Sequence, residues 1–200
     1  NNVTERKHAE HVLKLNELRL QAQLQLHQME DRPTSELCDF VLDKGVVITA
    51  SEMGFLGFIS EDQETMTIHA WSNLAMANCR IFDKPIEFRI ADAGLWGEIV
   101  RTGRPVIISD YAAPHPAKKG CPEGHVRITR FMGVPVFEGE RVVAVAAMAN
   151  KQTDYDELDV KHLTLMVETL WYSREKKRKK DAIRDSEERF RKYFELGVVG

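Results

Sequence analysis

The 200-residue sequence lacks paired cysteines, long apolar runs and a strong net charge. Its three cysteines, Cys38, Cys79 and Cys121, are an odd number, and no two of them are spaced as Cys-x-x-Cys. This pattern predicts reduced thiols and excludes both a disulfide framework and a zinc site of the usual spacing. It also excludes the Cys-x-x-Cys-His motif by which c-type haem is attached.

No stretch approaches the roughly 18 consecutive apolar residues of a membrane span, and the N-terminal stretch NNVTERKHAEH has no apolar signal-peptide core. The formal charge of −3 gives no general attraction to nucleic acid or to an anionic membrane. We therefore expect a cytoplasmic location, with neither a membrane segment nor a nucleic-acid partner in this fragment. The 43% hydrophobic content is enough for one core with extensions.

The first helix is predicted by an absence, because neither proline nor glycine occurs between Thr4 and Asp31. A helix of this length with one apolar seam favours pairing with a partner helix over packing in a core. Thr34 or Ser35, after Arg32-Pro33, is predicted to cap a second helix that runs to about Thr49. The seam consists of apolar residues three and four positions apart: Leu15, Leu18, Ala22, Leu26 and Met29.

The rest of the sequence alternates β-rich runs with helical segments and predicts an α+β sandwich. Its central sheet is expected to be mostly antiparallel, with about six strands and helices packed on its faces. Asp110 to Thr129 is predicted to be a long functional loop. The predicted strands are 55–59, 65–72, 85–90, 106–108, 131–137 and 141–150. The predicted helices are 73–82, 95–102, closed by Gly103, and a last one capped by Asp156 that runs toward Phe194.

Several motifs resemble the GAF domains of bacterial and archaeal sensor histidine kinases over about residues 34 to 172. The ends resemble PAS domains, through Val3 to Lys7 and Ser186 to Arg191. The resemblance implies a connector helix over residues 1–32, a GAF sensor domain over 33–172, and a connector over 173–200 that leads into another PAS domain. The carriers are Gly94-Leu95-Trp96-Gly97-Glu98, Arg101 to Pro105, Asp110-Tyr111, Gly124-His125, Arg130-Phe131, Val134-Pro135-Val136 and Ala149-Asn150-Lys151.

Two residues are candidates for holding a ligand in the pocket that the resemblance implies between the sheet and the long loop. His125 follows a glycine in that loop, where a neutral imidazole can bind a metal or simply hydrogen-bond the loop closed. Cys79 shares a predicted helical face with Ala75 and Phe82, which fits either the border of an apolar slot or a small buried hydrophobe.

The sequence is similar to archaeal redox-sensing kinases that carry haem in a GAF domain through one cysteine. By this resemblance, Cys79 forms a single thioether with a haem vinyl group and His125 is an axial ligand of the iron. His69 is the second candidate for the axial position. Cys121 is an alternative attachment site or a redox partner of Cys79, and His115, between two prolines, is expected to be solvated.

Three functions follow from these patterns. The first is a haem-bearing redox or gas sensor that forms a homodimer through its connector helices, with the kinase core outside this fragment. The second is a GAF domain for another small ligand, or a ligand-free dimerisation spacer. The third is an enzyme that reduces methionine sulfoxide with cysteines, which the cysteine spacing does not match. The basic run Lys176 to Lys180 is flanked by carboxylates, as in a solvated connector.

Overall fold

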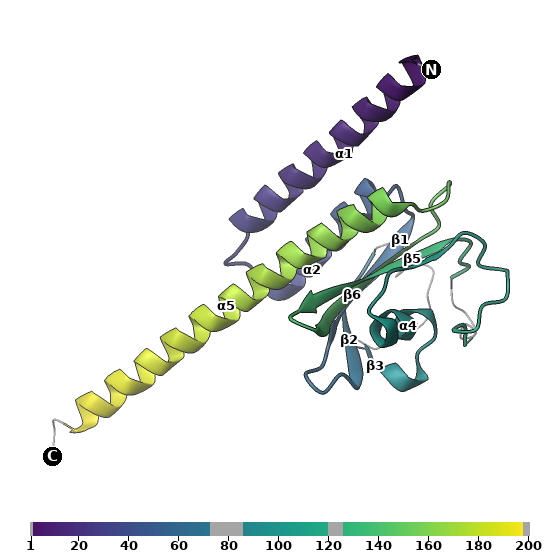
Figure 1. The fold of residues 1–200 in the computed structure, drawn as a ribbon. Helices are drawn as coiled ribbons and strands as arrows, with labels where there is room; N and C mark the ends of the chain where they lie inside the picture. The colour runs from purple at the N-terminus through teal and green to yellow at the C-terminus, as the bar shows by residue number, and fades with distance from the viewer. Residues whose placement is uncertain (1, 73–85, 120–125, 198–200) are drawn as a thin grey trace.

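A computed structural model describes residues 2–72, 86–119 and 126–197 of the chain (Figure 1). Cys79, Cys121 and His125 lie outside the described residues, as does the predicted helix 73–82. The remaining predictions can be compared with the structure element by element.

The described strands form one six-stranded sheet in the order β3-β2-β1-β6-β5-β4, and each neighbouring pair is antiparallel. The α+β prediction is therefore confirmed. The alanine-rich β6 lies inside the sheet, as expected, because its small side chains allow helices to approach closely. The strands are β1 Met53–Ile59, β2 Thr65–Trp71, β3 Ile86–Arg89, β4 Val106–Ile108, β5 Phe131–Glu138 and β6 Arg141–Ala149.

Two helices, α2 (Thr34–Ile48) and the first half of α5 (Glu157–Gly197), cover one face of the sheet, which we call the helix-covered face. The first helix, α1 (Asn2–Gln28), packs on α2 and α5 as an outer layer. Figure 1 shows α1 running alongside α5 in the same direction. Gln23 of α1 donates to the carbonyl of Leu165 at 3.1 Å and to Thr169 Oγ1 at 2.7 Å. The other face packs against the 3-10 turn η1 (Ile90–Asp92) and α4 (Leu95–Thr102), and we call it the α4 face.

The apolar seam of α1 packs into the core of its own chain. Ala22 and Leu26 are 1% and 0% exposed, and Leu18 and Met29 pack against the same cluster. The prediction that this seam pairs with a partner helix in preference to a core is therefore wrong for these residues. These residues pack against apolar side chains of α2 and α5 in the same chain.

The predicted cap of α2 is also wrong in its residue. Pro33 occupies the N-cap position with an extended backbone (φ −54°, ψ 145°), and no side chain caps the helix. Thr34 is already the first helical residue. The proline ring restricts φ of Pro33, and its side chain has no oxygen that could accept a hydrogen bond from the first helical N–H groups.

The start of α5 follows the sequence prediction closely. Asp156 Oδ1 accepts hydrogen bonds from the backbone N–H groups of Leu158 and Asp159 at 2.9 and 3.0 Å. Asp159 Oδ2 accepts in return from the N–H of Asp156 at 3.0 Å. Such reciprocal capping satisfies amides that have no partner within the helix.

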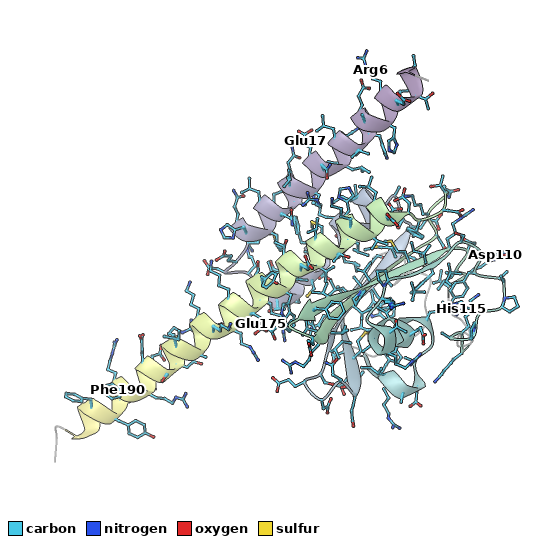
Figure 2. The ribbon with its side chains drawn as sticks, in the orientation of Figure 1. Arg6, Glu17, Asp110, His115, Glu175 and Phe190 are labelled. Atoms are coloured by element: carbon cyan, nitrogen blue, oxygen red, sulfur yellow. The ribbon has the colours of Figure 1, made fainter. Side chains whose placement is uncertain are left out.

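Beyond the domain, α5 continues without a break to Gly197, and every residue from Ala182 to Phe194 is exposed. Phe190 is 72% exposed, and Figure 2 shows it far along the helix from the sheet. In the part of the chain that the structure describes, no helix is both long and apolar enough to cross a membrane.

Candidate functional site

The α4 face carries most of the partly buried aromatic side chains of the domain. Phe88 of β3 and Trp96 of α4 meet edge to face, with ring centroids 5.7 Å apart. Phe55 and Trp71 lie 5.6 Å apart on the neighbouring strands β1 and β2. Aliphatic side chains from the strands and from α4 form a buried floor beneath them: Ile68, Ile90, Leu95, Ile99 and Val145. The result is an apolar cluster in which several aromatic rings are only partly buried.

The helix α4 is held tightly to the turn before it. Arg101 Nη1 donates to the carbonyl of Ile90 at 3.0 Å. A Cβ atom at Gly97 would lie 2.5 Å from Ala93 Cβ and 2.8 Å from Arg101 Nη1, so a side chain there would push the helix away. The Gly-Leu-Trp-Gly-Glu motif therefore places Trp96 on α4, and Gly97 of the same motif allows α4 to lie close to η1.

The described first half of the long loop lies against the same helix and turn. Lys119 Nζ donates to the carbonyl of Ala91 at 2.7 Å. The base of the loop is closed by the N–H of Tyr111, which donates to the carbonyl of Thr129 at 2.8 Å. Figure 2 shows Asp110 and His115 at the end of the molecule away from Phe190.

Trp71, eight positions before Cys79, and Val126, next to His125, pack in one small cluster beside the α4 face. Trp71 ends the strand that leads toward Cys79, and Val126 directly follows His125. Trp71 and Val126 both pack against Met53 of β1 in one small cluster. Cys79 and His125 themselves lie outside the described residues, so their predicted roles stay predictions.

His69, the second candidate for an axial ligand, lies on the helix-covered face. Its ring packs on Phe58 at 4.8 Å, beside a pocket of about 280 Å³ that also involves Trp171 and Arg174 of α5. Partial burial of the ring, followed by the charge of Arg174, lowers the pKa of His69. The structure therefore does not bring His69 together with Trp71 and Val126.

The charged side chains that α5 contributes to the lining of this pocket pair with one another. The Arg174 guanidinium carbon lies 4.4 Å from the Phe58 ring centroid and 5.0 Å from that of Trp171. Glu175, only 5% exposed, pairs with Arg174 at 3.1 Å and with Arg178 at 2.9 Å. The charges of the pocket thus already have partners within the chain.

Two other predicted residues have local roles. His115 Nδ1 accepts a hydrogen bond from the N–H of Ala117 at 3.2 Å, which holds a turn of the loop. Cys38 is 0% exposed, and burial raises the pKa of its thiol to about 12, so it is not a reactive thiolate. Among residues 2–72, 86–119 and 126–197, no three His, Cys, Asp or Glu side chains group as a metal site.

The end of the long loop is joined to the start of α5 through Asn150 and Lys151. Asn150, at a positive φ of 64°, accepts from the N–H of Thr129 at 2.8 Å and donates to the carbonyl of Arg127 at 3.0 Å. Lys151 Nζ pairs with Asp159 Oδ2 at 2.5 Å, and both side chains are largely buried. In the sequence, Asn150 and Lys151 stand out only through the family resemblance. The pair Lys151–Asp159 has no signal there, because its members are eight positions apart and come together only when the turn between them folds back.

The fold is that of a known family of domains. A family model described as "GAF domain" matches residues 31–173, and the chain belongs to the GAF domain family. Among curated proteins, it is 42% identical over 182 residues to the "Methyl sulfide methyltransferase-associated sensor" of Methanosarcina acetivorans. The match covers 91% of this chain but 18% of that protein, so the chain spans less than a fifth of its relative.

Solved structures of other GAF proteins share the fold at low identity. The GAF domain of a phosphoenolpyruvate-protein phosphotransferase from Coxiella burnetii has a TM-score of 0.66 at 17% identity, covering 82% of this chain and 96% of that one. Free methionine-R-sulfoxide reductase from Neisseria meningitidis also gives 0.66, at 15% identity and coverages of 84% and 93%.

The GAF domain of a sensor histidine kinase from Pseudomonas syringae pv. tomato gives a TM-score of 0.54 at 14% identity, covering 93% of this chain and 99% of that one. At such identities these likenesses establish the fold alone.

Proposed function

We propose that this GAF domain is the sensory part of a larger signalling protein and that it binds haem on the α4 face. Cys79 would attach the haem, His125 would be an axial ligand, and α5 would carry the state of the site outward. The observation that carries this proposal is the cluster of Trp71, Val126 and Met53 at the end of a face with partly buried aromatic rings.

The chemical character of the residues on this face supports the haem proposal. The macrocycle needs an apolar, planar-walled site, and Phe55, Trp71 and Tyr111 are only partly buried there. Cys79 would add its S–H across a vinyl double bond: sulfur bonds one carbon, hydrogen goes to the other, and no external oxidant is needed. A neutral His125 would offer one ring nitrogen to the iron. Bound haem supplies a one-electron couple and a position for a gas ligand.

The name of the Methanosarcina relative supports a sensory role. The proposal extends this role to a parent protein in which PAS domains flank residues 33–172 and a histidine kinase core lies elsewhere. We propose that the domain itself is not an enzyme, because the described cysteine, Cys38, is sealed in the core and does not provide a thiolate.

The haem proposal is tested by spectroscopy of the purified chain loaded with hemin. We expect a Soret band that shifts on reduction and a pigment that resists acidified organic extraction. Cys79→Ala should release the haem on extraction and His125→Ala should move the Soret band. Matched controls are Cys121→Ala and His115→Ala, which should do neither. A colourless chain that takes up no hemin, or a Cys79→Ala variant that still retains haem on extraction, would contradict the proposal.

A second feature supports dimerisation through the connectors as part of the same function. Large apolar side chains stand exposed along α5, with Ile183 at 62%, Phe190 at 72% and Phe194 at 66%. Residues 7 and 4 positions apart lie on one helical face, as in helix pairs. We propose that this α5 stripe is where two copies meet, and not the partly buried Leu18 or the buried Leu26.

The dimer is tested by sedimentation of the full chain. Ile183→Lys combined with Phe190→Lys should shift the chain toward monomer, whereas Glu188→Lys, on the opposite side of α5, should leave the distribution unchanged. A haem-free wild-type chain that dimerises as strongly as the loaded one would favour the spacer function over the sensor. Unchanged sedimentation of the double variant would refute the α5 stripe as the interface.

A further inference from the structure

One histidine is buried where α1 lies on α5, away from the α4 face. His162, in α5, is 1% exposed, yet neither of its ring nitrogens has a hydrogen-bond partner among the described residues. Arg19 of α1 has a buried Nε that also lacks a partner there, although its Nη1 donates to Gln23 Oε1 at 2.6 Å. An unpartnered polar group in a buried interface is energetically costly.

The charged groups around His162 come from both helices. Burial is the main cause that lowers the pKa of His162, and the cation of Arg19 on α1 lowers it further. Lys161 acts in the same direction, whereas the carboxylates of Asp159 and Asp156 oppose it more weakly than burial does. The docked helix pair therefore holds the imidazole neutral.

We propose that His162 makes the docking of α1 on α5 dependent on pH, because protonation places a second cation beside Arg19 in a buried contact. This device does not rest on the proposed haem function, since it involves neither Cys79 nor His125. It concerns the two helices by which the domain joins its neighbours.

The direction follows from proton linkage. When α1 is released, His162 is exposed and regains the ordinary histidine pKa of about 6.5. The released state then binds more protons than the docked state at any pH below that value. Docking is thus strongest above about pH 6.5 and weakens as the pH falls, by up to about tenfold per pH unit until the lowered pKa of the docked state is reached.

Other contacts of α1 are compatible with reversible docking. Gln23 makes two hydrogen bonds to α5, and Glu30, in the turn just after α1 and 29% exposed, pairs with Lys176 of α5 at 2.9 Å. Only Ala22 and Leu26 of α1 are fully buried. The contact is therefore partly polar, and one added charge is a substantial change to it.

Hydrogen exchange with mass spectrometry on the full chain tests this proposal. Between pH 7.5 and 5.5, after correction for intrinsic exchange, the opening constant of peptides from residues 15–28 should rise about tenfold in the wild type. His162→Phe should abolish this pH dependence, because phenylalanine fills the site without titrating. His8→Gln, which removes an exposed histidine of α1, should leave it intact. A slope that persists in His162→Phe, or that is absent in the wild type, would overturn the proposal.

A second measurement covers the case in which His162→Phe does not fold. Proton exchange at the imidazole C2 position of the wild-type chain gives the pKa of each histidine separately. We expect His162 to titrate below the ordinary histidine value of about 6.5, and a value at or above it would also overturn the proposal. Neither measurement involves haem, so both outcomes are independent of whether the chain binds haem.

Discussion

The two faces of the sheet differ in what covers them. On the helix-covered face, side chains such as Leu42, Val134 and Leu170 are 0–1% exposed between the sheet and the helices that cover it. On the α4 face, aromatic side chains such as Phe88 and Trp96 remain only partly buried. The difference supports the proposal that the helix-covered face mainly stabilises the domain and that the α4 face binds the ligand, because large apolar side chains left half-covered are typical of ligand sites.

The contacts between strands and helices reinforce this contrast. A Cβ atom at Gly54 would lie 2.6 Å from the carbonyl oxygen of Ala147 and 3.3 Å from Leu42 Cδ1 of α2. On the α4 face, a Cβ at Gly133 would meet only the flexible end of Ile99 and the Phe131 ring. The helix-covered face therefore has less freedom to adjust than the α4 face.

We expect the largest effect at the ion pair between Lys151 and Asp159, which links the end of β6 to the start of α5. Asp159→Asn removes the carboxylate that holds Lys151, which has 15% side-chain exposure, and leaves a largely buried cation without its counterion. We expect a loss of about 3–5 kcal/mol in the free energy of unfolding by urea titration. Glu10→Gln, which breaks the exposed pair with Arg6, should change it by less than about 0.5 kcal/mol. Equal losses in the two variants would show that the Lys151–Asp159 pair contributes no more stability than an exposed ion pair.

On the helix-covered face, Leu170→Ala should cost about 2–4 kcal/mol, because it opens a cavity at a fully buried position. The matched change Ile183→Ala, on the exposed half of the same helix, should cost less than about 0.5 kcal/mol. Urea titration of both variants at pH 7.5 measures the difference. If the two variants were equally stable, the burial of α5 against the sheet would be wrong.

On the α4 face, Phe88→Leu should cost only about 1 kcal/mol, since leucine keeps apolar contact but loses the edge-to-face pair with Trp96. The same variant should weaken hemin uptake by a larger factor than Leu170→Ala does, measured by absorbance titration. A Phe88→Leu variant that loses as much stability as Leu170→Ala would remove the proposed division between the faces.

The sequence predicted the elements better than their contacts. Val106–Ile108 and Leu95–Thr102 form as expected, and Gly103 closes its helix with φ 62°. These features depend on local patterns of apolar residues, glycine and capping side chains. Leu26 was misassigned because an apolar seam reads the same whether it faces its own core or a second molecule.

The candidate site was predictable only in part. The aromatic residue Trp96 lies in a motif that can be read directly, whereas the pairing of Lys151 with Asp159 depends on how a turn folds back. His162 gave no signal at all, since a polar residue in a helical pattern is normally assigned to the solvent side. The partners of both residues lie on other segments, and such partners are invisible in a single sequence.

The unbroken length of α5 has a mechanical consequence. No glycine or proline interrupts it between Glu157 and Leu196, and 41 helical residues extend about 60 Å. Over that length a tilt of about 5° at the capped end moves the far end by about 5 Å, so the helix acts as a lever arm. A small tilt of α5 on the sheet would therefore displace its exposed half, near Phe190, by a few ångströms.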